Sequence, residues 1–289
     1  MSAVYKRELR AYMNNVYGWL FAAVLLMYVG LMVYMDNLTT GYPQFEYALS
    51  DSQYALLVLI PILSMRSMAE DKRNKTDMFY LSLPMKTSAV VLGKYFATLT
   101  VLGLSCVILC VYPPLMSLLG PVNMGMAYLS ILQFFLLGAA LLALCQFASS
   151  LSDNLVVAAV LGVVACALLL FLPILAYRVI PATPMVSFIG LVVLALCAGG
   201  VAFLTTRNLN VTAITCAAGV VPLSLVYIFA KDLFNSLLAD VLGGISPFVH
   251  FATFCEYGTF SLGSLLLLLS YPVFFVFLTV QSADKKRWD

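Results

Sequence analysis

Long apolar runs separated by short polar segments make up most of the chain. A membrane-spanning helix needs about 20 mostly apolar residues to cross the hydrocarbon core. Helices are expected because a backbone in lipid has to satisfy its own hydrogen bonds, whereas barrel strands would read as short alternating segments. Runs that meet or approach this length occupy residues 18–35, 54–69, 91–118, 126–149, 155–176, 185–205, 211–230 and 260–281. The pattern therefore predicts an all-α, polytopic integral membrane protein with about eight spans.

Prolines and polar residues interrupt some of the apolar stretches. Pro61 lies inside the second run and favours a kink, and Pro113 with Pro114 favours a break near the end of the third run. Residues 231–259 are mostly apolar but are broken by polar residues, glycines and Pro247. We interpret this segment as an interfacial or re-entrant piece on the outer side of the membrane. The chain is otherwise expected to form a single membrane domain over residues 1–289.

Lysine and arginine are distributed unevenly between the polar segments. Cytoplasmic segments of membrane proteins carry an excess of these residues. With the N-terminus inside, thirteen of the fifteen lie in inner segments: Lys6, Arg7, Arg10, Arg66, Lys72, Arg73, Lys75, Lys86, Lys94, Arg207, Lys285, Lys286 and Arg287. Only Arg178 and Lys231 lie in outer segments. The sequence thus predicts that both termini are cytoplasmic, which requires an even number of spans. Six and eight both satisfy this, and we favour eight because residues 185–205 and 211–230 are each long enough to cross.

Composition supports the membrane class and narrows the chemistry. The chain is 63% hydrophobic and only 10% charged, against about 25% charged residues in soluble domains, so it is not an ordinary soluble globule. Seven cysteines, an odd number, lie almost entirely inside apolar runs and form no CxxC pair, which argues against a disulfide framework. The only histidine is His250, too few for a histidine-rich metal site. We expect no metal, no cofactor and no nucleic-acid partner on this chain.

The first 17 residues have the features of an amphipathic helix at a membrane surface. Lys6, Arg7 and Arg10 lie near one face and apolar residues lie elsewhere. A basic amphipathic helix at the cytoplasmic surface of the membrane explains this pattern. A generic positively charged flank of the first span explains the charges equally well, so both interpretations stay open.

A short polar island between the second and third spans is the most informative segment. It carries mixed charges on Glu70, Asp71, Lys72, Arg73 and Asp77, together with Thr76, and then an apolar cluster before Leu83 and Pro84. We predict a helix from about Ser67 to Leu83, ended by Pro84, with its charged part in the cytoplasm and its apolar part against the bilayer or a partner. The alternative is a solvated loop, which would not need the apolar cluster.

The residues in and after this island follow a recognisable order. They read Met65-Arg66-Ser67-Met68-Ala69-Glu70-Asp71-Lys72-Arg73, Thr76-Asp77, Leu83-Pro84, Thr87 and Val91-Leu92-Gly93-Lys94. This order resembles that of type-2 ABC exporter permeases, although Lys75 stands where that family usually has glycine. Near the C-terminus, Ser246-Pro247 and His250-Phe251 are similar to the gliding-motility-type branch. The resemblance covers about residues 1–175 and 245–289, and residues 185–230 look like an insertion into the usual six-helix core.

The resemblance implies a permease subunit that is driven by another chain. Residues 66–90 would form the cytoplasmic coupling helix, and the residues expected to dock the ATPase are Glu70, Asp71, Lys72, Arg73, Thr76, Asp77, Leu83 and Pro84. The sequence contains no GxxxxGK[ST] phosphate-binding loop, so ATP and Mg²⁺ are expected on a separate ATPase subunit and not on this chain. The expected partners are that ATPase, a second permease chain and the lipid bilayer of a prokaryotic cytoplasmic membrane.

Three other kinds of membrane protein are alternatives to an ABC exporter. An ATP-independent carrier predicts inverted repeats and charged residues at mid-membrane, and neither is evident in the sequence. A structural membrane subunit would show no substrate-dependent ATPase stimulation. An intramembrane metalloprotease would need several histidines and acids within the spans, which this sequence does not have. The transported substrate stays open among lipid-linked, amphipathic and peptide-like molecules, as does the choice between a homodimer and a heterodimer.

Overall fold

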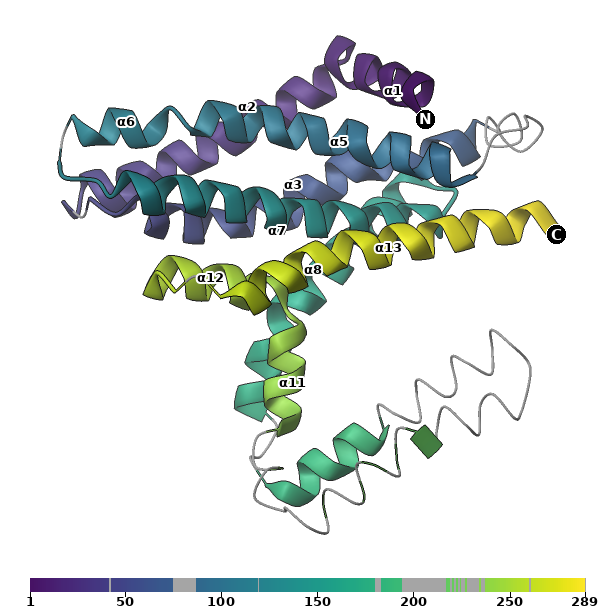
Figure 1. The fold of residues 1–289 in the computed structure, drawn as a ribbon. Coiled ribbons are helices and arrows are strands. Elements are labelled where there is room, and N and C mark those ends of the chain that lie inside the picture. The colour runs from purple at the N-terminus through teal and green to yellow at the C-terminus, as the bar shows by residue number, and fades with distance from the viewer. Residues whose placement is uncertain are drawn as a thin grey trace. The chain divides into compact units, whose positions relative to one another are not determined.

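The computed structural model describes residues 1–41, 43–74, 87–118, 120–179, 183–193, 237–259 and 261–288, and seven positions between 217 and 234. The elements that it describes are helices (Figure 1). The chain forms two compact units. Unit 1 contains residues 1–168 and 250–289, and unit 2 contains residues 169–249. The all-helical class predicted from the apolar runs is confirmed for the described residues.

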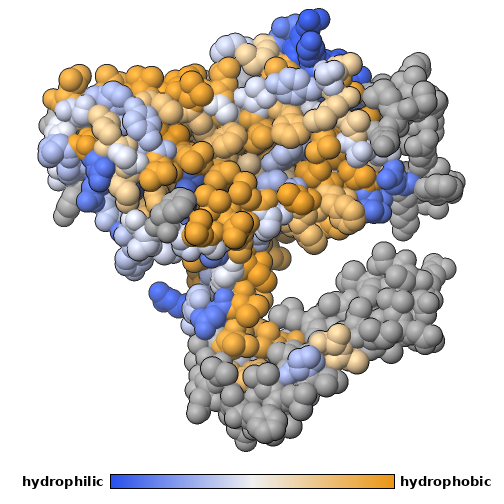
Figure 2. All heavy atoms as spheres, viewed as in Figure 1, coloured by the Kyte–Doolittle hydropathy of each residue, from blue (hydrophilic) through white to orange (hydrophobic). Residues whose placement is uncertain are grey.

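Unit 1 is a bundle of long helices with a shorter N-terminal helix across one end (Figure 1). Its elements are α1 (Ser2–Asn14), α2 (Val16–Met32) with the π-helical turn η1 (Val33–Leu38), α3 (Phe45–Arg73), α5 (Thr87–Leu109), α6 (Tyr112–Ser117), α7 (Met124–Ser150), the first part of α8 (Leu155–Val179), most of α12 (Pro247–Tyr257) and α13 (Leu262–Trp288). On the face shown in Figure 2, hydrophobic residues cover much of the helices, and hydrophilic residues gather at α1. This distribution suits a bundle whose sides face lipid.

Helix α7 is the centre of unit 1. It packs against α3, α5 and α13. Within its most apolar stretch 72% of the residues are buried, compared with 17% in α13. The run Gly138–Ala139–Ala140 lies in this buried stretch, and small side chains allow helices to approach closely in a membrane. The central position of α7 therefore follows from its small residues, although hydropathy alone does not separate α7 from the lipid-facing helices.

Among the residues that the structure describes, six helices are long and apolar enough to cross a membrane. They are Val16–Leu38, Phe45–Arg73, Thr87–Ser117, Met124–Ser150, Leu155–Arg178 and Leu262–Asp284. A bent pair, α11 (Leu237–Ile245) and α12, is either a broken seventh span or a re-entrant segment. The interfacial or re-entrant segment expected over residues 231–259 therefore stays a prediction. The predicted spans 185–205 and 211–230 fall largely outside the described residues, apart from a short apolar helix over Pro184–Val193. The count of eight therefore stays a prediction.

The start of α3 corrects the expected boundary of the second span. The sequence predicted an outer loop over residues 36–53 and a span over 54–69, but the helix begins at Phe45. Polar residues in its first turns, among them Glu46, Ser52 and Gln53, are buried against neighbouring helices. A hydropathy pattern assigns such polar residues to a loop. It contains no information on whether protein or lipid surrounds a residue.

The prolines affect the helices differently. Helix α3 continues through Pro61, which transmembrane helices tolerate when neighbouring groups compensate the lost hydrogen bond. The break expected near Pro113 and Pro114 is confirmed, because α5 ends at Leu109 and α6 begins with a proline in its first turn.

Unit 2 contains the end of α8, the helix Pro184–Val193, α11 and the first turn of α12. Its small core consists of Leu191, Phe234 and Leu238, with Phe188 and Tyr227 packed against it. The Phe188 and Tyr227 rings are stacked with their centroids 4.5 Å apart. This core joins the helix Pro184–Val193 to α11.

Candidate coupling site at the charged end of unit 1

Basic side chains and the carboxylates paired with them gather in unit 1 where α1 lies. We call this region the charged end and define it by Glu8, Arg66, Glu70, Asp71, Lys72 and Lys94. The stretch from residue 33 to residue 60, towards the other end of α2 and α3, contains no lysine or arginine and carries Asp36, Glu46 and Asp51. The C-terminal part of α13 reaches the charged end as well, since Ser282 Oγ lies 3.3 Å from Ser150 Oγ of α7. Both chain ends therefore lie at the same end of unit 1 (Figure 1).

Lys94 of α5 is the buried centre of this end. Its side chain is only 3% exposed, and its Nζ lies 2.7 Å from Asp71 Oδ2 and 3.3 Å from Glu8 Oε1. The same ammonium group donates a hydrogen bond of 2.6 Å to the carbonyl oxygen of Ser67. An ammonium group has three donors, and burying it costs several kcal/mol unless they find partners. Lys94 therefore joins α5 to α1 through Glu8 and to α3 through Asp71 and Ser67.

Gly93 brings α1 against α5 beside this lysine. A Cβ atom at Gly93 would lie 3.1 Å from Val4 Cγ1 and 3.3 Å from the backbone nitrogen of Tyr5. The Tyr5 hydroxyl is 3.0 Å from Thr100 Oγ1, further along α5. Any side chain at position 93 would press on the α1 backbone. The glycine therefore sets the close approach that lets Glu8 reach Lys94.

Arg66 and Tyr12 connect the first two helices to α3. The Arg66 guanidinium donates through Nε and Nη2 to the two carboxylate oxygens of Glu70, at 2.8 and 2.7 Å. Its Cζ lies 4.3 Å from the centroid of the Tyr17 ring, which is a cation–π contact. The Tyr12 hydroxyl donates to the carbonyl oxygen of Leu63 at 3.3 Å. Burial raises the pKa of Tyr12, so its hydroxyl keeps the proton that it donates.

The end of α7 is bonded to the end of α3. Ser149 Oγ accepts from the backbone N–H of Ala69 at 3.1 Å and donates to the carbonyl of Met65 at 3.0 Å. Lys72 donates to the carbonyl oxygen of Ser150, and its Nζ lies 3.6 Å from Asp153 Oδ1. The last turns of α3 are thus bonded to α5 and α7, and through Lys94 to α1.

The family of the chain follows from a comparison with known proteins. Residues 6–229 match the family model described as ABC-2 family transporter protein. The chain belongs to this family. No curated protein matches it. As an ABC-2 permease, the chain is the membrane part of an ABC transporter, and the family implies an ATPase partner. Residues 185–229, which were expected to be an insertion, fall inside the matched range, whereas the C-terminal resemblance falls outside it.

The structure of this ABC-2 permease corrects the expected start of the helix that carries the predicted docking residues, and their docking role stays a prediction. Glu70, Asp71, Lys72 and Arg73 form the end of α3, so no separate helix starts at Ser67. The helix continues there because Ser67, only 2% exposed, packs inside the bundle. The charged part of this segment was expected to point into the cytoplasm. Asp71 and Lys72 are instead bound to neighbouring helices, whereas Arg73 is exposed. Predicted docking residues outside the described part of the chain are Thr76, Asp77, Leu83 and Pro84.

The N-terminal helix of the ABC-2 permease agrees with expectation in its amphipathic character. Lys6, Arg7 and Arg10 are exposed on α1, while Val4 and Tyr12 are buried. Its position at a membrane surface stays a prediction.

Sequence reasoning missed the roles of Glu8 and Lys94. Lys94 was used as a marker of the inner side and as part of the family motif, and not as a member of an ion pair. A lysine in the second turn of a spanning helix is costly unless it is paired, which was the available signal for a buried ion pair.

Proposed function

We propose that this ABC-2 permease is the membrane subunit of an exporter, driven by ATP that a separate ATPase subunit hydrolyses. The ATPase docks on the segment formed by residues 66–90. The charged end faces the cytoplasm of a prokaryote, and two permease chains enclose the pathway. The substrate class is lipid-linked, amphipathic or peptide-like. The gliding-motility branch stays a prediction.

The observation that carries the docking proposal is the bonding of the end of α3. Arg73 and the C-cap residue Asn74 lead directly into residues 75–86. A displacement of that segment by an ATPase would pull on Asp71 and Lys72, which are bound to α5 and α7. Through Lys94 it would also act on α1. A partner that displaces the charged end would therefore act on four helices, α1, α3, α5 and α7.

The buried contacts of Asp71, Lys72 and Lys94 are suited to passing a displacement from the end of α3 to the neighbouring helices. Removing one partner of a buried charged pair typically destabilises a protein by about 3–5 kcal/mol, because the other charge is left buried and unpaired. Such a pair resists separation and moves as a unit. A solvated loop at the end of α3 would absorb the displacement without passing it on.

Co-purification with an ATPase tests the proposal. The full chain is co-expressed with its encoded chromosomal neighbours and purified in mild detergent, and any ATPase subunit that is recovered with it is measured. Arg73→Glu reverses an exposed charge at the end of α3, and Lys6→Glu is the matched control because it reverses an exposed charge on α1. We expect Arg73→Glu to lower the recovered ATPase and the control to retain it.

Two results would contradict the proposal. Equal recovery of the ATPase by both variants would argue against docking at the end of α3. Recovery of the wild-type chain without any ATPase, combined with transport in proteoliposomes that lack ATP, would favour an ATP-independent carrier.

A further inference from the structure

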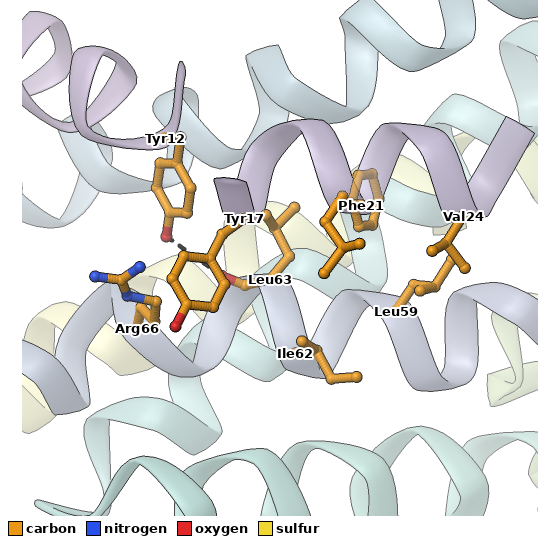
Figure 3. A pocket seen from close by; sticks show the side chains of 9 residues that line it. Tyr12, Tyr17, Phe21, Val24, Leu59, Ile62, Leu63 and Arg66 are labelled. Carbon is orange, nitrogen blue, oxygen red and sulfur yellow. Dashed lines mark hydrogen bonds between the residues drawn. The ribbon is translucent and has the colours of Figure 1, made fainter. Parts of the chain in front are cut away.

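Gln133 of α7 is a buried polar residue whose hydrogen-bonding groups find no partner in the described part of the chain. Its side chain is only 1% exposed, and neither its amide nitrogen nor its amide oxygen is bonded there. The buried Tyr12 near the charged end differs, because its hydroxyl donates to the carbonyl oxygen of Leu63 (Figure 3). A buried amide without partners is costly, above all in a membrane, where no bulk water reaches it. Gln133 therefore points to a bound hydrogen-bonding group.

Gln133 lies on the side of α7 that faces α13. On this side the ring centroid of Phe147 is 6.1 Å from that of Phe275 on α13. Gln133 and Phe147 are two heptads apart in the sequence, and residues at heptad spacing lie on the same side of packed helices. The amide of Gln133 is therefore directed towards α13 and not towards α3 or α5.

The level of Gln133 along α13 follows from the direction of the two helices. Both run towards the charged end, where Ser150 Oγ of α7 lies 3.3 Å from Ser282 Oγ of α13. Both rise by the same distance per residue. Counting back along both helices, from this contact and from the contact between the two rings, places Gln133 opposite residues 261–265. This range includes Ser264, in the first turn of α13.

Helix α12 brings a hydrogen-bonded pair to the same level. The ring centroids of Phe134 on α7 and Phe251 on α12 are 5.8 Å apart, and these residues follow Gln133 and His250 in the sequence. His250 Nδ1 lies 3.0 Å from Ser264 Oγ. Gln133, His250 and Ser264 thus come from three helices and lie near one another. We call this region the polar junction and define it by these three residues.

The polar junction selects its occupant by size and by chemistry. Phe134 and Phe251 beside it are fully buried, so a bulky headgroup has no opening there. A cation would leave the amide nitrogen of Gln133 without an acceptor, and an anion would leave its amide oxygen without a donor. Water both donates and accepts, and a buried water typically makes about three hydrogen bonds to buried polar groups. Water is therefore the small ligand that suits both atoms of this amide.

We propose that ordered water occupies the polar junction and hydrogen-bonds Gln133 to the pair formed by His250 and Ser264. The water accepts from Nε2 of Gln133 and donates to Oγ of Ser264, which has a second lone pair for it. This bridge attaches α12 to the central helix α7 and to α13. It lies in the half of α7 away from the charged end and is independent of the docking proposal.

Hydroxyl-radical footprinting on the full chain tests the proposal. The protein in nanodiscs receives a brief X-ray pulse, which converts water to hydroxyl radicals that oxidise the side chains beside it. The rings of Phe134 and Phe251 are the reporters, because they are fully buried and bulk water does not reach them. We expect both rings to be oxidised in the wild-type chain. Unoxidised rings would overturn the proposal and would favour a direct bond from Gln133 to another side chain. This measurement does not depend on the folding of a variant.

A matched pair of substitutions locates the water. Gln133→Leu removes both amide atoms at similar size. Gln146→Leu is the control, because Gln146 lies on the same helix, is also 1% exposed and already donates to the carbonyl oxygen of Val91. We expect Gln133→Leu to abolish the oxidation of Phe134 and Phe251, and Gln146→Leu to leave it unchanged. Equal oxidation in the two variants would exclude water at Gln133.

Hydrogen exchange measures the attachment of α12. Its backbone amides exchange when the helix opens locally, so weaker attachment gives faster exchange. We expect faster exchange over residues 251–257 in Gln133→Leu than in the wild-type chain, and the wild-type rate in Gln146→Leu. Slower exchange in Gln133→Leu would overturn the proposal, because removing an unsatisfied amide stabilises its surroundings whereas removing a bonded one does not. An unchanged rate would contradict the bridge to α12.

Discussion

Lys94 on α5 and Asp71 on α3 form a buried ion pair, with 2.7 Å between Nζ and Oδ2. Glu8 of α1 completes the shell around the ammonium group at 3.3 Å. The two carboxylates come from helices that are far apart in the sequence, so the lysine connects three separate segments. This arrangement is the physical basis of the first prediction.

Lys94→Met should destabilise unit 1 strongly. The substitution leaves Asp71 and Glu8 facing each other in a buried site, and removing one partner of such a site costs about 3–5 kcal/mol. We expect a lower midpoint of thermal unfolding in detergent and lower yield from membranes. Lys6→Met, at an exposed position on α1, should change the free energy of unfolding by less than about 0.5 kcal/mol. Equal midpoints for the two variants would show that the buried pair does not stabilise the fold.

Gly93→Val should release α1 from α5. A Cβ atom at this position already approaches Val4 Cγ1 and the Tyr5 backbone within 3.3 Å, so a branched side chain displaces α1. We expect faster trypsin cleavage at the basic residues of α1. Gly103→Val is the control on the same helix, because a Cβ there meets only Phe135 Cε2 at 3.5 Å, an ordinary contact. If trypsin cleaves both variants at the wild-type rate, the contact at Gly93 does not hold α1.

The sequence predicted helices well but did not predict what surrounds them. Apolar runs located the six described spans because length and hydropathy are local properties. Burial of Glu46 and Gln53 is a tertiary property, and it explains why the start of α3 was missed. The same limit applies at the charged end. Lys94 was recognised as a charge at a helix end, but its partner Glu8 lies on a helix that no local pattern connects to it.

The predicted orientation requires that the charged end face the cytoplasm. Lys6→Cys places an exposed thiol on α1, and Thr40→Cys places one in the turn after η1, beyond the far end of α2. In intact cells a membrane-impermeant maleimide should label Thr40→Cys, and it should label Lys6→Cys only after permeabilisation. The wild-type chain controls for native cysteines, of which Cys106, Cys145, Cys166 and Cys255 are buried. Labelling in the reverse order would invert the orientation and remove the cytoplasmic docking site.

The number of spans can be decided at one position between the two predicted additional helices. If residues 185–205 and 211–230 both cross the membrane, the turn that contains Arg207 lies in the cytoplasm, where its charge agrees with the positive-inside rule. Asn208→Cys should then react with an impermeant maleimide only in permeabilised cells, as Lys6→Cys does. If the pair does not cross, position 208 stays on the same side as Thr40, and the two thiols should react alike in intact cells. In that case Arg207 would be a third outer basic residue beside Arg178 and Lys231, and the chain would have the six spans of the described structure.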